Sequence, residues 1–361
     1  MNTPPKILIV RLSAIGDVIH STPILHSLRR KFPEAYIAWA IEDKSSDIII
    51  NNALIDKIFV FPKQKWKNRG FNIKNLWEFF ILIKKIRKEK FDIVIDLQEL
   101  FKSAIIAFLS GAKRKIAHAG TREFASIFVN EKLPAHDNFD PDKLIIERYL
   151  EPAAYLGAPV DQVQFSLPPV SESAKIYIDK LLENIDKNKE IIIFSPATIW
   201  DSKHWLEKYW AELLEKLAPE YNIIFTGTEK DKELIARICR ARDEQVNNTN
   251  QKSNYLSLAG KTNLFELIEL FNRAKYLIAP DTGPAHIANA TQKPSIIMLF
   301  GSTGFKRTPP FGEKHIALAA ELPCQPCFKR KCPRSDNNME CMKQLSPEKI
   351  LTFIEQRNRV Y

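Results

Sequence analysis

Residues 6–17 read KILIVRLSAIGD, a short apolar run followed by a polar turn that contains one glycine and one acid. The apolar part, from Lys6 to Arg11, predicts a β-strand. Gly16 permits a tight turn out of that strand, and Asp17 follows where a helix begins. A strand, a glycine turn and a helix in this order predict the first element pair of a parallel α/β layer.

Apolar runs and amphipathic stretches alternate in the same way along the rest of the chain. Strands are expected at 6–11, 36–41, 57–61, 92–97, 115–118, 190–194, 222–226, 276–279 and 295–300. Helices are expected at 17–32, 75–90, 99–109, 141–156, 172–184, 207–217, 230–240, 263–272, 283–290 and 346–357. This alternation predicts an α/β fold with two doubly wound parallel-sheet domains facing a central cleft. Such sheets bind ligands beyond the carboxyl ends of their strands, so the segments after the strands are the candidate sites.

Two domains fit the length, because 361 residues exceed what one ordinary core holds. A polar, proline-containing stretch at 157–171 interrupts the alternation and predicts the boundary. We therefore expect a first domain at 1–165 and a second at 166–345. Residues 346–361 are expected to form a C-terminal helix with Ser346 as its N-cap, and one expected position for it is back on the first domain.

Composition narrows the class of protein. Hydrophobic residues make up 45% of the chain and charged residues 27%, which is ordinary for a globular protein and argues against disorder. No apolar run approaches the roughly 20 residues that span a bilayer, and the N-terminus lacks a signal-peptide pattern. We therefore expect a soluble, cytoplasmic protein.

The net charge of +10 is spread unevenly. Residues 61–90 contain ten lysines and arginines against two acids, Glu78 and Glu89. This density favours phosphate-rich partners or an anionic membrane surface, with a solvated helix face as the alternative. Charge alone also suits nucleic acid, but the sequence shows no recognition-helix or zinc-finger pattern, so no nucleic-acid partner is expected.

Three polar segments follow predicted strands. Asp17 follows the first strand, either as a helix-capping acid or as a general base at the mouth of the cleft. A single glycine in that turn falls short of the three in a dinucleotide fingerprint, which disfavours a nicotinamide oxidoreductase. The segment 195–205 offers hydroxyls and Lys203 to a diphosphate, or it is a polar surface loop. The segment 225–231 joins a strand to an acidic helix start.

Residues 280–290, PDTGPAHIANA, form the most specific pattern in the chain. The helix is expected to start near Gly283, with Pro284 in its first turn. The backbone N–H groups of Thr282 and Gly283 can then form an anion-binding nest at that helix start. His286 lies one turn further on, towards the same site. A capping Asp281 beside a buried histidine is the alternative interpretation.

These motifs together resemble a known family, the ADP-heptose:lipopolysaccharide heptosyltransferases of glycosyltransferase family nine. The resemblance covers nearly the whole chain and rests on residues 16–17, 94–98, 102–103, 122, 147–150, 201–205 and 281–286. It implies a GT-B fold, two Rossmann-like domains of which the first takes the acceptor and the second the nucleotide-sugar. It also implies an inverting transfer that needs no metal or other cofactor.

The resemblance assigns roles by position. Asp17 would be the catalytic base, and Lys203 would balance the charge on the departing diphosphate. The donor-binding set would be Ser195, Thr198, Lys203, Thr226, Gly227, Asp231, Asp281, Thr282, Gly283 and His286. Candidates for the acceptor are Arg11, Ser13, Lys65, Gln98, Lys102, Arg114 and Arg122.

Four of the five cysteines, Cys324, Cys327, Cys332 and Cys341, lie within 18 residues. Short spacings of this kind in a cytosolic protein favour a structural zinc site. Free thiols in a packed loop and disulfides are the alternatives. Cys239, within a predicted helix, is expected to be a small core residue.

The expected activity is transfer of heptose from ADP-L-glycero-D-manno-heptose to the lipopolysaccharide inner core, with Kdo-lipid A or heptosyl-Kdo-lipid A as acceptor. The protein is expected to be a monomer in peripheral contact with the inner face of the inner membrane. The alternatives are a family relative that uses another nucleotide-sugar or a protein acceptor, and a non-catalytic module that binds anionic glycolipid.

Overall fold

The computed structural model describes residues 3–70, 72–137, 140–246, 255–336 and 338–360. The chain divides into two compact units, Met1–Pro169 (unit 1) and Val170–Tyr361 (unit 2). The division falls a few residues after the expected boundary because 161–166 stay bound to unit 1. Asp161 pairs with Arg30 at 2.8 Å, and Ser166 N donates to Thr22 Oγ1 at 3.1 Å.

Unit 1 is built on a six-stranded parallel sheet in the order β3-β2-β1-β4-β5-β6. Its strands are β1 (Lys6–Val10), β2 (Tyr36–Glu42), β3 (Lys57–Phe61), β4 (Ile93–Asp96), β5 (Arg114–His118) and β6 (Glu131–Leu133). The order reverses between β1 and β4, which is where such sheets bind ligands. The apolar run that opens the sequence is the central strand, and Ile7 to Val10 are fully buried.

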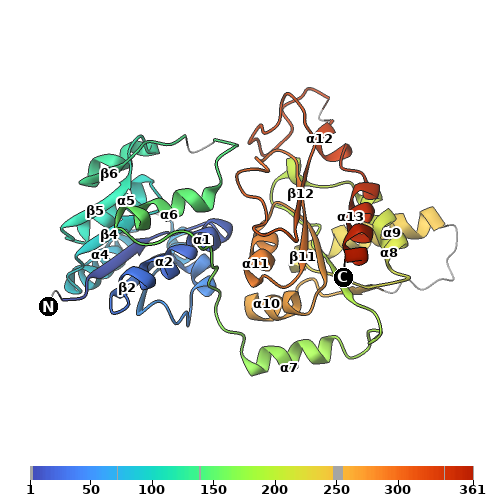
Figure 1. The fold of residues 1–361 in the computed structure, drawn as a ribbon, viewed down its shortest axis with the longest axis horizontal. Helices are drawn as coiled ribbons and strands as arrows, with labels where there is room; N and C mark the ends of the chain where they lie inside the picture. Colours follow the sequence, from blue (N-terminus) through green and yellow to red (C-terminus); the bar gives the residue numbers. More distant parts are fainter. Residues whose placement is uncertain (1–2, 71, 138–139, 247–254, 337, 361) are drawn as a thin grey trace. The chain divides into compact units, whose positions relative to one another are not determined.

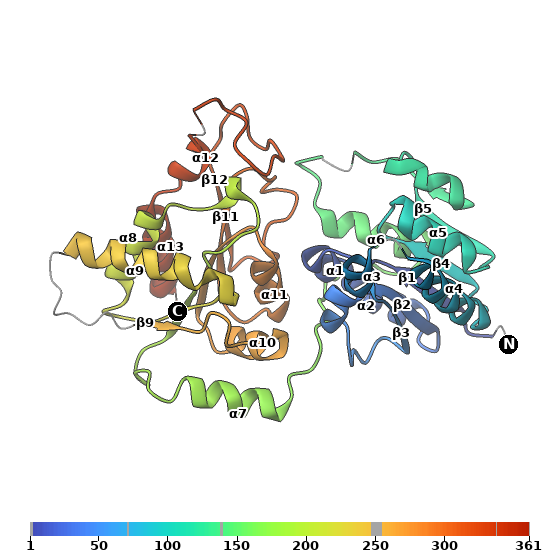
Figure 2. The ribbon, with the colours of Figure 1, turned by 180° about the vertical axis from the view of Figure 1, so that it is seen from behind.

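Helices cover both faces of this sheet. They are α1 (Ile15–Ser21), α2 (Pro23–Lys31), α3 (Lys63–Arg69), α4 (Ile73–Lys88), α5 (Phe101–Leu109) and α6 (Ile145–Tyr155), with short 3-10 turns η1 (Asp43–Ile48) and η2 (Arg122–Phe128). In Figure 1, α1, α2 and α6 lie in front of the sheet, and α6 packs against both of the others. Figure 2, seen from behind, shows α3, α4 and α5 on the other face.

Unit 2 repeats the plan with the strand order β12-β11-β10-β7-β8-β9. Its strands are β7 (Ile191–Phe194), β8 (Asn222–Phe225), β9 (Tyr255–Ser257), β10 (Tyr276–Pro280), β11 (Ser295–Phe300) and β12 (Ile316–Ala319). Its helices are α7 (Glu172–Leu181), α8 (Glu207–Leu217), α9 (Lys232–Val246), α10 (Leu264–Asn272), α11 (Gly283–Thr291), α12 (Glu340–Lys343) and α13 (Pro347–Val360), with turns η3 (Asp201–Lys203) and η4 (Glu229–Asp231).

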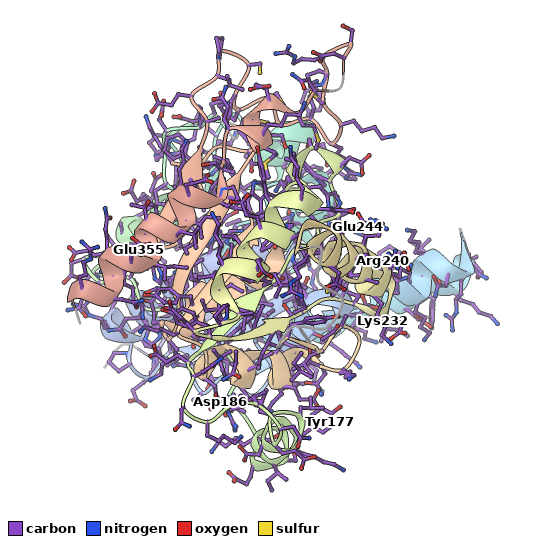
Figure 3. The ribbon with its side chains drawn as sticks, turned by 90° about the vertical axis from the view of Figure 1, so that its right-hand side faces the viewer. Tyr177, Asp186, Lys232, Arg240, Glu244 and Glu355 are labelled. Atoms are coloured by element: carbon purple, nitrogen blue, oxygen red, sulfur yellow. The ribbon has the colours of Figure 1, made fainter. Side chains whose placement is uncertain are left out.

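The C-terminal helix α13 packs within unit 2 and contacts α8. Ile350 and Ile354 join the apolar core of that unit, and Asn358 accepts a hydrogen bond from Tyr276 at 3.0 Å. The apolar face of α13 thus belongs to the core of unit 2, and its expected position against the first domain stays a prediction. Figure 3 shows one side of unit 2, with Glu355 on α13 and with Lys232, Arg240 and Glu244 along α9.

Among the described residues, no helix combines the length and the apolar character that crossing a bilayer requires.

Candidate active site

The turn after β1 places Asp17 at the carboxyl end of the unit 1 sheet. Asp17 is the third residue of α1, and its Oδ2 accepts a hydrogen bond from Ala14 N at 3.3 Å. The same oxygen pairs with Arg11 Nη2 at 2.9 Å, while the side chain of Asp17 keeps 34% of its surface exposed. Asp17 therefore has the capping contact and is still accessible to a reacting hydroxyl.

Tyr149 of α6 also contacts Asp17. Its hydroxyl donates to Asp17 Oδ1 at 3.2 Å, and its ring stacks under the Arg11 guanidinium at 4.8 Å. Arg11 is buried and donates to the Leu97 carbonyl at 2.5 Å. These contacts hold the carboxylate in one orientation, as the positioning of a general base requires.

Gln98 and Ser13 meet at the β1–α1 turn. Gln98 Oε1 accepts from Leu12 N at 3.0 Å and from Ser13 N at 3.1 Å. The side-chain oxygen of Gln98 thus holds the β1–α1 turn in place, and its amide nitrogen is the part left for a ligand. Four of the predicted residues, Arg11, Ser13, Asp17 and Gln98, meet at the ends of β1 and β4.

Lys102, at the start of α5, reaches the end of β2. Its Nζ donates to Glu42 Oε1 at 2.7 Å, and Lys63 donates to the same carboxylate at 3.0 Å. Burial lowers the pKa of Lys102, and the hydrogen bond that Lys102 donates to Glu42 opposes that effect. The two lysines leave a net positive charge at this edge of the sheet, which suits an anionic acceptor.

The other predicted acceptor residues lie elsewhere. Lys65, on α3, pairs with Glu78 at 3.0 Å. Arg114 is the first residue of β5, so it lies at the amino edge of the sheet, where Glu131 binds it at 2.7 Å. The structure thus separates Arg114 from the carboxyl edge. Arg122 begins η2, and its side chain lies outside the described residues.

In unit 2 the predicted donor residues Lys203 and His286 contact Asp281, which is buried and directly follows β10. Lys203 Nζ donates to Asp281 Oδ2 at 2.7 Å and to its carbonyl at 2.9 Å. His286 Nε2 lies 3.0 Å from Oδ1, and Thr303 donates to Oδ2 at 2.7 Å. Burial by itself raises the pKa of Asp281, but Lys203 and His286 outweigh burial and hold that pKa far below its usual range.

The helix α11 starts directly beside this carboxylate. Thr282 is its N-cap, Gly283 its first residue and Pro284 its second. The N–H groups at this end have no partner within the helix and point at the carboxyl edge of the sheet. Asp281 accepts two hydrogen bonds from the Lys203 ammonium, whose Nζ also lies over the Trp200 ring at 4.8 Å, so these contacts hold the cation beside the helix start.

The turns after β7 and β8 supply the rest of the predicted donor set. Ser195 and Thr226 are buried, and within the described part of the chain Thr226 Oγ1 has no hydrogen-bond partner. Thr198 Oγ1 accepts from Trp200 N at 3.3 Å. Asp231 Oδ2 caps η4 through Thr228 N at 2.7 Å. Gly227 is required there, because a Cβ on it would lie 2.9 Å from the Cβ of Asp231.

The four clustered cysteines line one small cavity with Ser202, Gly301 and Ser302. The loop that carries them packs on η3, since Ser202 donates to the Lys329 carbonyl at 2.6 Å and its own N–H donates to the Arg330 carbonyl at 3.1 Å. Burial raises the pKa of the Cys341 thiol, and the neighbouring cysteines add to the effect. The cysteine loop thus supports the turn that carries Lys203.

Sequence reasoning missed a polar cluster at the end of β5, where His118 lies. His118 Nε2 and His136 Nε2 lie 2.7 and 2.6 Å from Glu151 Oε2, and Lys143 donates to Oε1 at 2.7 Å. Burial raises the pKa of Glu151, but hydrogen bonds from Lys143, His136 and His118 outweigh it and lower the pKa to about 2. Among the described residues, the ligand atoms of His118, His136 and Glu151 alone come within 4.8 Å of one another as a metal-competent set.

Two doubly wound parallel sheets in one chain, each with polar residues beyond the carboxyl ends of its strands, form the GT-B fold that many glycosyltransferases share. The sequence model of glycosyltransferase family 9 (heptosyltransferase) matches residues 79–337. The chain therefore belongs to glycosyltransferase family 9 and is an enzyme.

Proteins of similar sequence are named lipopolysaccharide heptosyltransferases. The chain is 27% identical to the lipopolysaccharide core heptosyltransferase OpsX of Haemophilus influenzae, over 85% of this chain and 82% of the relative. It is 24% identical to the lipopolysaccharide heptosyltransferase 1 of Pseudomonas aeruginosa, over 97% of both chains. It also resembles the structure of Escherichia coli heptosyltransferase WaaC with ADP-2-deoxy-2-fluoro heptose, with a TM-score of 0.71, 24% identity, and 98% and 99% of the two chains covered. The fold class and family predicted from the sequence are confirmed, while the roles of single residues stay predictions.

Proposed function

We propose that the protein transfers heptose from ADP-L-glycero-D-manno-heptose to the inner core of lipopolysaccharide, with Kdo-lipid A or heptosyl-Kdo-lipid A as acceptor. The observation that carries the proposal is the convergence of Lys203 and His286 on Asp281 at the start of α11 in a family 9 chain. The relatives named above as lipopolysaccharide heptosyltransferases support the sugar and the acceptor.

In this proposal unit 1 binds the acceptor and unit 2 binds the donor. Asp17 takes the proton from the acceptor hydroxyl as its oxygen attacks the anomeric carbon of the heptose. The bond from that carbon to the β-phosphate oxygen breaks, ADP leaves with the electron pair, and the configuration inverts. The ammonium of Lys203 and the N–H groups that begin α11 stabilise the charge on the leaving diphosphate.

The residues around the two proposed sites suit different parts of the substrates. The acceptor is anionic, and Arg11, Lys102 and Lys63 place positive charge at the edge of unit 1 where Asp17 lies. Thr226 and Asp231 follow β8 and suit the hydroxyls of a nucleoside. No metal takes part in the transfer, because the protein's own cations and helix N-terminus meet the leaving group. The protein acts as a monomer in peripheral contact with the inner face of the inner membrane.

The zinc predicted for the cysteine loop requires its thiols to move. The four cysteines line one cavity, but among the described residues no three of their sulfur atoms come within 4.8 Å of one another, whereas a zinc site brings its thiolates around one ion. Zinc bound here would therefore draw the loop together and so hold η3 and Lys203 in place. Elemental analysis of protein purified without chelator should give one zinc per chain, which the Cys324→Ser/Cys327→Ser variant loses. Metal-free, active protein would assign the cysteines to the thiol alternative.

The activity is tested by following nucleotide release from a panel of ADP-, UDP- and GDP-sugars with deep-rough lipopolysaccharide as acceptor. Acceptor-dependent release of ADP from ADP-heptose is expected. Asp17→Asn should lower kcat by about 100- to 10,000-fold, the range for loss of a general base, with the affinity for ADP unchanged. Asp161→Asn, an exposed acid of the same unit, is the matched control.

Release from another nucleotide-sugar would keep the reaction and change the donor. An unaffected Asp17→Asn variant would remove this carboxylate from the chemistry. If no sugar turns over while anionic glycolipid still binds, the chain is a binding module and not a transferase.

A further inference from the structure

Helix α4 has apolar side chains on two opposite sides. On the inner side, Ile83 and Ile86 are buried in the core of unit 1, and Phe79 and Leu82 pack against it. This inner side is the ordinary apolar stripe of a helix on a sheet. The outer side carries a second stripe, which the fold of unit 1 does not need.

The second stripe faces solvent over the first half of the helix. The exposed fraction is 81% for Ile73, 70% for Trp77, 54% for Leu76, 51% for Phe80 and 39% for Ile81. These residues recur at the three- and four-residue steps that bring side chains onto one face of a helix. Exposed apolar residues scattered singly need no explanation, but a contiguous stripe of this kind marks an interaction surface.

The neighbouring elements α5 and η2 also carry exposed apolar side chains. Phe101 and Phe108 of α5 are each about half exposed, and Phe124 and Ile127 of η2 are exposed by 80% and 68%. The ring of Phe128 joins α5 to η2 through edge contacts with Phe101 and Phe108. Figure 2 shows α3, α4 and α5 together on this side of the sheet. We call the outer residues of α4, with Phe101, Phe108, Phe124 and Ile127, the apolar face of unit 1.

The charges around the apolar face decide what covers it. The second half of α4 carries Lys84, Lys85, Arg87 and Lys88, and α3 beside its first half carries Lys63, Lys65, Lys67 and Arg69. The acid on α4, Glu78, is bound by Lys65, Arg69 and the Trp66 indole, which lower the pKa of its carboxyl to about 2. A second copy of the chain docked on this face would bring two cationic rims together.

We infer that the apolar face of unit 1 inserts into the interface of an anionic lipid bilayer. The aliphatic and aromatic side chains of α4 would lie below the headgroups, and Trp77 suits this boundary because its ring is apolar and its indole N–H is polar. The flanking lysines and arginines bind lipid phosphates while their stems cover apolar surface. An amphipathic helix of this kind lies in the plane of the interface.

This inference rests on the proposed function only in that a lipid-linked acceptor is presented at the same bilayer. Neither donor nor acceptor is needed for the insertion itself. The apolar face can therefore be tested on vesicles that contain no lipopolysaccharide, so its failure is separate from a failure of the transferase activity.

The test is co-sedimentation of the full chain with phosphatidylcholine vesicles and with vesicles containing phosphatidylglycerol. Leu76→Glu/Trp77→Glu is expected to lower the partition coefficient on anionic vesicles at least tenfold, at low and at high salt. Lys84→Gln/Lys85→Gln/Lys88→Gln is expected to lower it at low salt and to have little effect at high salt, where charges are screened. Ile176→Glu, an exposed apolar residue on α7 of unit 2, is the control and should change nothing.

Fluorescence provides a second measurement. Binding should shift the tryptophan emission to the blue, brominated lipids should quench it, and Trp77→Phe should remove most of both effects. Unchanged partitioning of the Leu76→Glu/Trp77→Glu variant would overturn the insertion, whether or not the lysine variant weakens binding. A wild-type dimer that the Leu76→Glu/Trp77→Glu variant converts to a monomer would also overturn the insertion. It would show that the apolar face binds a second copy of the chain.

Discussion

At the scale of single residues, Asp96 shows how a buried carboxyl shapes the site indirectly. It ends β4, and its Oδ1 accepts from the N–H groups of Gln98 and Glu99 at 3.0 Å, which forms the turn that presents Gln98 to the β1–α1 turn. Burial, aided by the charge of Glu99, raises the pKa of Asp96 from 3.8 to about 7. Because the folded state then holds a proton that the unfolded state releases, stability is expected to fall as the pH rises between these two values.

Asp96→Asn should remove this pH dependence, because an amide keeps the accepting oxygen and carries no charge. The free energy of unfolding of the variant relative to the wild type should rise by roughly 1–3 kcal/mol between pH 5 and pH 8. Urea unfolding at several pH values measures the difference, with the exposed Asp161→Asn as control. Parallel pH profiles for wild type and Asp96→Asn would show that Asp96 is not the group responsible.

The pair of Lys203 and Asp281 is a second case at this scale. Lys203→Met leaves Asp281 charged and buried, so the variant should lose about 3–5 kcal/mol of stability at pH 7. Since the pKa of Asp281 is depressed, its contribution is present at neutral pH and is lost in acid as the carboxyl takes up a proton. Adding Asp281→Asn to the lysine variant should restore part of the loss. A double variant whose losses simply add would show that the two groups do not interact.

At the scale of elements, the close approach of β11 to the cysteine loop links the fold to the donor site. A Cβ on Gly301 would lie 2.7 Å from the Ser202 carbonyl oxygen and 2.5 Å from Met342 Sδ. Gly301→Ala should therefore push η3 away from the end of β11, cost roughly 1–3 kcal/mol, and weaken ADP binding about tenfold through Lys203. Titration calorimetry and urea unfolding measure the two effects. If Gly301→Ala loses stability but binds ADP with unchanged affinity, Gly301 contributes to packing and not to the donor site.

The strands and their contacts show which parts of the fold and the site the sequence could predict. The central strands were predictable because runs such as Ile191–Phe194 are apolar throughout, whereas the edge strands β6 and β9 have three residues each and no such run. The pattern around Asp281 was predictable because its parts are adjacent in the chain. Tyr149 reaches Asp17 across 132 positions, and only the fold reveals that contact.

At the scale of the whole molecule, each unit has its own apolar core, one around β1 and one around β7. Two cores of this kind are expected to unfold in two calorimetric transitions. Leu8→Ala, which opens a cavity in the fully buried core of unit 1, should lower one of them. The donor-binding residues proposed here all lie in unit 2, so saturating ADP should raise the other transition alone.

The size of that shift follows from mass action. At an ADP concentration 100 times its Kd, unit 2 gains about 2.7 kcal/mol, and Thr226→Val should reduce the gain if its buried hydroxyl, unpartnered within the described residues, binds the nucleotide. Scanning calorimetry of the full chain with and without ADP measures both effects. If ADP instead raises the transition that Leu8→Ala lowers, the donor site belongs to unit 1. The proposed assignment of the acceptor to unit 1 and of the donor to unit 2 is then wrong.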